Sequence, residues 1–150
     1  MNTYAHHTNM PIKSRIVLDT NCLLASLSSK SENFRVWKDF QQGKYTLCVS
    51  NEILEEYEEI IARKASPSVA QNVIRAIVES KHVEFVDLHF HVYAIFADPD
   101  DNKFVDCAFA ANATFIVSED SHFDALKRLS FPKIMVIELK TFLNFLKERD

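Results

Sequence analysis

The chain alternates short, mainly apolar runs with longer segments in which apolar residues recur at helical spacing. The short runs occupy residues 16–18, 45–49, 83–86, 114–118 and 134–137. Such runs are typical of strands that are buried on both faces of a sheet. The helical spacing covers residues 22–27, 34–40, 52–64, 67–80, 101–109 and 139–146. Because strands that alternate with helices form parallel sheets, the pattern predicts an α/β fold with about four to five parallel strands.

Residues with strong positional preferences mark several helix boundaries. Ser50 or Asn51 can cap the helix over 52–64, because their side chains accept hydrogen bonds from the first-turn backbone. Pro67 suits the first turn of the following helix. Gly43 can end the helix over 34–40. The boundaries therefore agree with the elements that the apolar pattern predicts.

Length and composition fit one domain. The 150 residues are 47% hydrophobic, which is enough for a sizeable core. We expect a flexible tail over residues 1–14 and one domain over residues 15–150. No apolar run approaches the roughly 20 residues of a membrane span, and no signal-peptide pattern begins the chain, so we expect a cytoplasmic protein with no membrane partner. The cysteines are expected to be buried free thiols; they are Cys22, Cys48 and Cys107.

Charge and glycine content remove several functional classes. The net charge is −4 and the isoelectric point is near 5.9, which argues against a generally basic protein that coats nucleic acid. The negative net charge does not exclude a nuclease, because the carboxylates of an acidic metal site themselves lower the net charge. Gly43 is the only glycine, so glycine-rich phosphate loops and dinucleotide fingerprints are excluded.

Two carboxylates follow predicted strands at their carboxyl ends. Asp19 comes directly after the run at 16–18, and Asp120 comes two residues after the run at 114–118. Taken alone, Asp19 fits a turn and Asp120 fits a helix cap. In open α/β sheets, however, functional sites collect at the carboxyl ends of the strands. The pair therefore favours a site at this edge of the sheet.

Helical geometry selects two further acids. At about 100° per residue, Glu56 flanks the apolar stripe of its helix and lies nearer the helix start than Glu58 does. Asp101 points with the apolar stripe of its own helix, whereas Asp106 points away from it. Carboxylates gathered in one cleft repel one another, and a divalent metal is the usual reason that a protein tolerates this.

Four segments that contain these acids resemble the motifs of PIN-domain proteins, in the order and spacing of that family. The similarity is greatest to small prokaryotic PIN proteins that act as toxins of toxin–antitoxin pairs. The segments run from Ile16 to Asn21, Val49 to Tyr57, Asp98 to Phe104 and Phe115 to Asp120. The resemblance implies a three-layer α/β/α sandwich and a ribonuclease that depends on Mg²⁺ or Mn²⁺.

The resemblance also assigns roles by position. It implies an acidic quartet, which comprises Asp19, Glu56, Asp101 and Asp120. Asn21 and Ser118 match the supporting polar residues, and Asp106 matches a position where this subgroup often carries another acid. The third metal ligand stays open among Asp98, Asp100, Asp101 and Asp106. Since Mg²⁺ takes oxygen ligands and keeps several waters, we expect Asp19 and Asp101 to be the main direct ligands.

The expected binding partners follow from the resemblance to PIN-domain ribonucleases. RNA phosphates need a basic rim, for which Lys103, beside Asp101, and Arg15 are the leading candidates. A toxin-like protein is expected to pair with a small antitoxin whose tail covers the cleft. A homodimer is also expected, because the aromatic residues exceed the needs of one small core; those in question are Trp37, Phe90, Tyr93 and Phe96.

Two alternatives remain open. One is a receiver-like phosphoacceptor domain, which requires paired acids after the first strand and a phosphoacceptor aspartate after the third. Here the first strand ends in one acid, Asp19, and Asp87 is a doubtful match for the other position. The second alternative is a PIN-like binding module without catalysis, whose mark would be loss of a quartet acid.

Overall fold

Five parallel strands form one sheet at the centre of the molecule. The computed structural model describes residues 14–88, 99–121, 123–124 and 134–150, and excludes the side chains of residues 99–101. The strands are β1 (Arg15–Leu18), β2 (Thr46–Val49), β3 (Val83–Phe85), β4 (Phe115–Val117) and β5 (Met135–Ile137), in the order β3-β2-β1-β4-β5. Every neighbouring pair is parallel, which confirms the predicted sheet.

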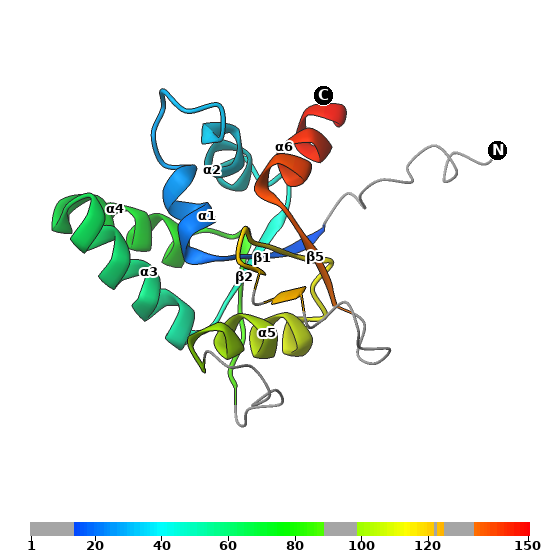
Figure 1. Cartoon of the computed structure of the whole chain (residues 1–150). Helices are drawn as coiled ribbons and strands as arrows, with labels where there is room; N and C mark the ends of the chain where they lie inside the picture. Colours follow the sequence, from blue (N-terminus) through cyan, green and yellow to red (C-terminus); the bar gives the residue numbers. More distant parts are fainter. Residues whose placement is uncertain (1–13, 89–98, 122, 125–133) are drawn as a thin grey trace.

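Helices cover both faces of this sheet. Those in the described part of the chain are α1 (Thr20–Ala25), α2 (Phe34–Gln41), α3 (Asn51–Lys64), α4 (Pro67–Val78), α5 (Pro99–Ala111) and α6 (Leu139–Glu148). In Figure 1, α2 and α6 lie on one side of the strands and α5 on the other. The expected α/β/α sandwich is therefore confirmed. The expected tail lies, except for Ser14, outside the described residues.

Serine side chains cap the starts of α3 and α4: Ser50 was a predicted cap, and Ser66 precedes the predicted first-turn Pro67. The Ser50 hydroxyl accepts a hydrogen bond from the Ile53 backbone N–H at 3.3 Å, and Ser66 accepts one from Val69 at 3.1 Å before Pro67. These bonds satisfy backbone donors that have no partner within their helices. The start of α3, which carries Glu56, is thereby fixed directly after β2.

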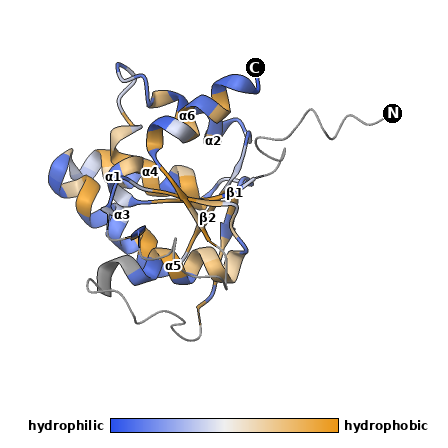
Figure 2. Cartoon of the chain, turned by 45° about the vertical axis from the view of Figure 1, so that its right-hand side comes forward, coloured by the Kyte–Doolittle hydropathy of each residue, from blue (hydrophilic) through white to orange (hydrophobic). Residues whose placement is uncertain are grey.

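The core is built from the strands and the inner faces of the helices. Ile16, Val17 and Leu18 of β1 are 0–1% exposed, as expected for a central strand with helices on both faces. Figure 2 shows apolar colour along the central strands, with polar residues on the outer faces of α2 and α6. The three cysteines are buried free thiols, as predicted. Burial raises the pKa of Cys22 to about 12 and that of Cys48 to about 11, so both remain protonated at neutral pH.

Trp37 belongs to this core and is not a surface aromatic. It is 8% exposed and its ring centroid lies 5.4 Å from that of Phe40. Residues 90, 93 and 96, the other aromatics considered for dimerisation, lie outside the described residues. Within the described chain, no helix is long and apolar enough to cross a membrane.

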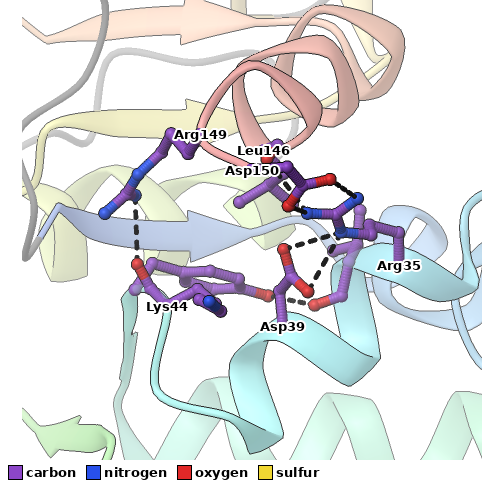
Figure 3. A network of polar contacts seen from close by, with 8 residues as sticks. Arg35, Asp39, Lys44, Leu146, Arg149 and Asp150 are labelled. Atoms are coloured by element: carbon purple, nitrogen blue, oxygen red, sulfur yellow. Dashed lines mark hydrogen bonds and ion pairs between the residues drawn. The ribbon is translucent and has the colours of Figure 1, made fainter. Parts of the chain in front are cut away.

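A polar clamp joins α2 to the end of α6 (Figure 3). Arg35 donates from Nε to both carboxylate oxygens of Asp39, at 3.1 and 3.0 Å, and from Nη2 to the Leu146 carbonyl at 3.1 Å. Its guanidinium also makes a two-point ion pair with Asp150. Bidentate pairing of this kind fixes geometry as well as charge. The clamp therefore holds the end of α6 against α2, on the same side of the sheet (Figure 1).

Candidate active site

The strand order creates a switch point between β1 and β4. From β1 the chain continues to β2 on one side, whereas β4 lies on the other side. Leu18 and Val117, the last residues of β1 and β4, are in register, and the Asp19 N–H donates to the Val117 carbonyl at 3.0 Å. Such crevices at the carboxyl ends of strands are the usual binding sites of open α/β sheets. Asp19 and Ser118 therefore lie side by side at the crevice.

Asp19 is a buried carboxylate, 9% exposed, at the start of α1. Burial raises its pKa above the usual range, and the nearby charges of Asp120 and Glu56 raise it further. Hydrogen bonds from the Ser118 hydroxyl and from the Asn21 backbone N–H oppose that rise. The three acids are therefore close enough to interact electrostatically.

Ser118 connects the acids of the two strands. Its hydroxyl donates to Asp19 Oδ2 at 2.7 Å, and its oxygen accepts from the Asp120 backbone N–H at 2.9 Å. Ser118 is itself 4% exposed. One buried hydroxyl thus fixes the orientation of Asp19 and of the loop that carries Asp120. Asn21 is exposed, and its backbone is the part of it that lowers the pKa of Asp19.

Glu56 approaches the same edge from the second turn of α3. Its Oε2 accepts a hydrogen bond from the Thr20 hydroxyl, and its Oε1 accepts one from Lys103 Nζ at 2.6 Å. Thr20 is 3% exposed. Glu56, which the sequence singled out from a run of glutamates by its angle on the helix, thus lies at the same edge as Asp19, whereas Thr20 was not singled out. The sequence shows a hydroxyl directly after Asp19, but nothing in it indicates that this hydroxyl meets Glu56.

Helix α5 carries the third of the four motif segments, and here the structure corrects one expectation, the position of Asp106. The acids at positions 100 and 101 lie in its first turn, but the description covers neither of their side chains, and residue 98 lies outside it altogether. Asp106 was expected to point away from the apolar stripe, yet it is 0% exposed. The reason is that α5 packs against α3 as well as against β1, β2 and β4, so more than one side of it is covered. Near the helix start, Asn102 Oδ1 is also buried without a hydrogen-bond partner.

The two basic residues that were expected to contact RNA phosphates lie at opposite edges of the sheet. Lys103 lies at the site and binds Glu56. Arg15 lies at the amino end of β1, opposite to Asp19, where it pairs with Glu84 and donates to the Ala111 carbonyl at 2.7 Å. Strand direction explains this, since the two ends of β1 face opposite edges of the sheet. Arg15 is therefore not brought to the acidic site.

Two hollows flank the acids. One, of about 470 Å³, is strongly polar; its lining residues are Glu52, Glu55, Glu56, Glu59, Ile60, Arg63 and Lys103. The other, of about 380 Å³, lies at the ends of β4 and β5; its lining residues are Ser118, Glu119, Asp120, Ser121, Asp124, Val136, Ile137, Glu138 and Thr141. Glu56 and Asp120 thus each border one open hollow, whereas Asp19 lines neither.

The donor set suits a hard divalent cation. Asp19, Glu56 and Asp120 offer only oxygen atoms, which Mg²⁺ and Mn²⁺ prefer. The pKa of Asp19 is raised mainly by burial and further by the charges of Asp120 and Glu56, and a nearby cation would favour the charged form of this carboxylate. No three of the described His, Cys, Asp or Glu side chains are spaced to hold a metal by themselves. The Asp101 side chain, at the start of α5, is not among the described side chains. The chemistry of the three described acids therefore fits a hard divalent ion that keeps water among its ligands.

Comparison with known proteins agrees with this fold. A family model described as "PIN domain" matches residues 15–122. The structure is similar to a chain of VapBC2 from Rickettsia felis, solved bound to a DNA fragment from its promoter, with a TM-score of 0.54 and 13% identity over 83% of this chain and 98% of that one. It is also similar to the PIN domain endonuclease Utp24, with a TM-score of 0.50 and 18% identity over 83% and 84% of the two chains. No curated protein matched the sequence.

Proposed function

The chain belongs to the PIN domain family, whose members are generally nucleases, and we propose that it is a divalent-metal-dependent ribonuclease. One observation carries the proposal. Asp19 and Asp120, from two strand ends, are coupled through Ser118 and lie close enough to Glu56 for their charges to interact. Family membership also argues against the receiver-like alternative. In addition, β2 separates β3 from β1, so an acid after β3 would not lie beside Asp19.

The protein's own residues would prepare the site for hydrolysis of a phosphodiester. Asp19, fixed by Ser118, and Asp101 of α5 would hold the cation. Asp120 and Glu56 would orient the attacking water, and both oxygens of Glu56 already accept hydrogen bonds. Mg²⁺ or Mn²⁺, when bound, would neutralise the scissile phosphate and acidify a water molecule. Because these carboxylates interact, no single one is assigned as the general base.

The test compares the wild type with Asp19→Asn on structured RNAs, with Mn²⁺ or with EDTA. We expect cleavage by the wild type that EDTA abolishes, and a loss of at least about 10²-fold in the variant, in line with removal of a group that stabilises the transition state. Asp19→Asn should also lose the rise in melting temperature that Mn²⁺ gives to the wild type through binding to the folded state. Full activity in a folded variant would refute the proposal, and a wild type that binds RNA without cleaving it would favour a binding module.

We further propose that the protein is the toxin of a toxin–antitoxin pair. The structural similarity to VapBC2 supports this idea at the level of the fold. Expression of the chain alone should slow bacterial growth, and expression of Asp19→Asn should not. A short neighbouring reading frame whose product restores growth and co-purifies with the chain would identify the antitoxin, and light scattering would show whether two copies of the chain associate.

A further inference from the structure

Glu56 is held by donors from two different helices. The Thr20 hydroxyl, at the start of α1, binds one carboxylate oxygen, and Lys103 Nζ, from α5, binds the other at 2.6 Å. With both oxygens engaged, the carboxylate is fixed by charge and by geometry. The sequence suggested Lys103 as a contact for substrate phosphate. In the structure its ammonium is directed to an acid of the site.

The environment makes this ion pair stronger than its neighbour on the surface. The side chains of Lys103 and Glu56 are 15% and 20% exposed. Arg63 and Glu59, which line the same hollow, form a 3.8 Å pair whose side chains are 63% and 70% exposed. Exposed pairs are screened by solvent and contribute little, whereas partly buried charges act on their surroundings more strongly. Lys103 therefore places an effective positive charge beside the acidic cluster.

We propose that Lys103 is a positioning residue that serves as a built-in countercharge: it holds Glu56 in place and weakens the binding of divalent cations to the acidic site. The inference rests on the proposed metal-dependent function. Without a cation, the ammonium offsets the charge of Glu56, one of the three acids. When a cation enters, the ammonium repels it, so the ion is held loosely. While its carboxylate contacts the Lys103 ammonium, Glu56 would act on the cation through a water molecule.

Titration calorimetry of Mn²⁺ binding to the full chain tests this inference. Lys103→Gln should bind Mn²⁺ about tenfold more tightly, the effect expected for one unit charge a few ångströms from a divalent ion in a partly solvated site. Lys103→Arg should restore wild-type affinity within about twofold, because the charge is retained. Arg63→Gln removes a cation from the same hollow and serves as the matched control, with a change of less than about twofold.

A double-mutant cycle separates a countercharge from a merely structural role. Glu56→Gln removes the carboxylate charge that the Lys103 ammonium contacts and should weaken Mn²⁺ binding about tenfold. In Glu56→Gln/Lys103→Gln the pair is neutral again, as in the wild type, so affinity should return to within about threefold of the wild type. The double variant leaves no unpaired charge, and it provides the test if Lys103→Gln alone does not fold.

Three outcomes overturn the inference. Unchanged or weaker Mn²⁺ binding by Lys103→Gln shows that the ammonium does not oppose the cation. A double variant as weak as Glu56→Gln shows that Glu56 acts as a ligand in its own right and that Lys103 is not its countercharge. If the wild type binds no Mn²⁺, the proposed metal-dependent function itself is wrong, which distinguishes that failure from the first two.

Discussion

Asp19 is a charged group kept in a buried position. Only 9% of it is exposed, and burial raises its pKa, with Asp120 and Glu56 adding to the effect. A buried carboxylate in its charged form costs free energy unless hydrogen bonds or a counterion compensate. Here the hydrogen bonds from Ser118 and the Asn21 backbone compensate only in part. We infer that stability is given up at this position for function.

Replacement of Asp19 by asparagine should therefore stabilise the metal-free protein. Asparagine has nearly the same shape and can still accept the Ser118 hydrogen bond, but it carries no charge to desolvate or to repel Asp120. We expect the melting temperature at pH 7 in EDTA to rise by a few degrees. Differential scanning calorimetry measures it. Ser118→Ala is the contrasting variant and should lower the melting temperature, because it leaves the Asp19 carboxylate with one donor fewer.

At the scale of the helices and strands, Gly43 shapes the connection from α2 to β2. Gly43 adopts a φ of 76°, a conformation that costs other residues about 1–2 kcal/mol. A Cβ atom at this position would lie 2.5 Å from the nearest atom of the His82 ring. The only glycine of the chain therefore meets a backbone requirement and a packing requirement together.

Gly43→Ala should lower the free energy of unfolding by about 2 kcal/mol, the sum of backbone strain and the contact with His82. Urea unfolding at pH 7 measures this change. In Gly43→Ala/His82→Ala the contact with the ring is removed but the backbone strain remains. The Gly43→Ala change should therefore lower the free energy of unfolding less in the His82→Ala background than in the wild type. Equal losses in the two backgrounds would mean that the His82 contact has no part in the effect.

Across the whole molecule, the end of α6 is tied to the other helix of its layer. Arg35 binds Asp39 within α2 and Asp150 after α6, which links positions far apart in the sequence (Figure 3). The hydrogen bond from Arg35 lowers the pKa of the Asp150 carboxyl. An acid whose pKa is lowered on folding stabilises the protein above its unfolded pKa, near 4, and loses that contribution as pH falls through the folded value.

Asp150→Asn should accordingly be less stable than the wild type at pH 7, and the difference should close as pH falls below about 4. Urea midpoints measured between pH 7 and pH 3 show the trend. Because Asp150 is exposed, 0.5 M salt at pH 7 should also narrow the difference. A difference that persists unchanged at pH 3 would mean that the Asp150 charge has no role in the clamp.

The sequence by itself determined the order and class of the elements and most of the candidate site. Continuous apolar runs and period-3.6 patterns indicate which residues are buried, so the parallel sheet and the helices around it were predicted correctly. Of the two residues considered as the cap of α3, Ser50 is the cap. Asp19 and Asp120 were found because strand ends are visible in sequence. Glu56 was found because its angle on α3 depends only on helix geometry.

Only the tertiary structure decided which charges meet. Asp106 was misjudged because a single helical stripe does not reveal that α5 is covered on a second side. Arg15 begins β1 and Asp19 follows it, so strand direction already argued against Arg15 at the site, and the structure shows that Arg15 pairs with Glu84 instead. The pairing of Lys103 with Glu56, and the support from Thr20, join residues from three helices. Such contacts depend on the packing of elements against one another, and local patterns in a sequence carry no record of them.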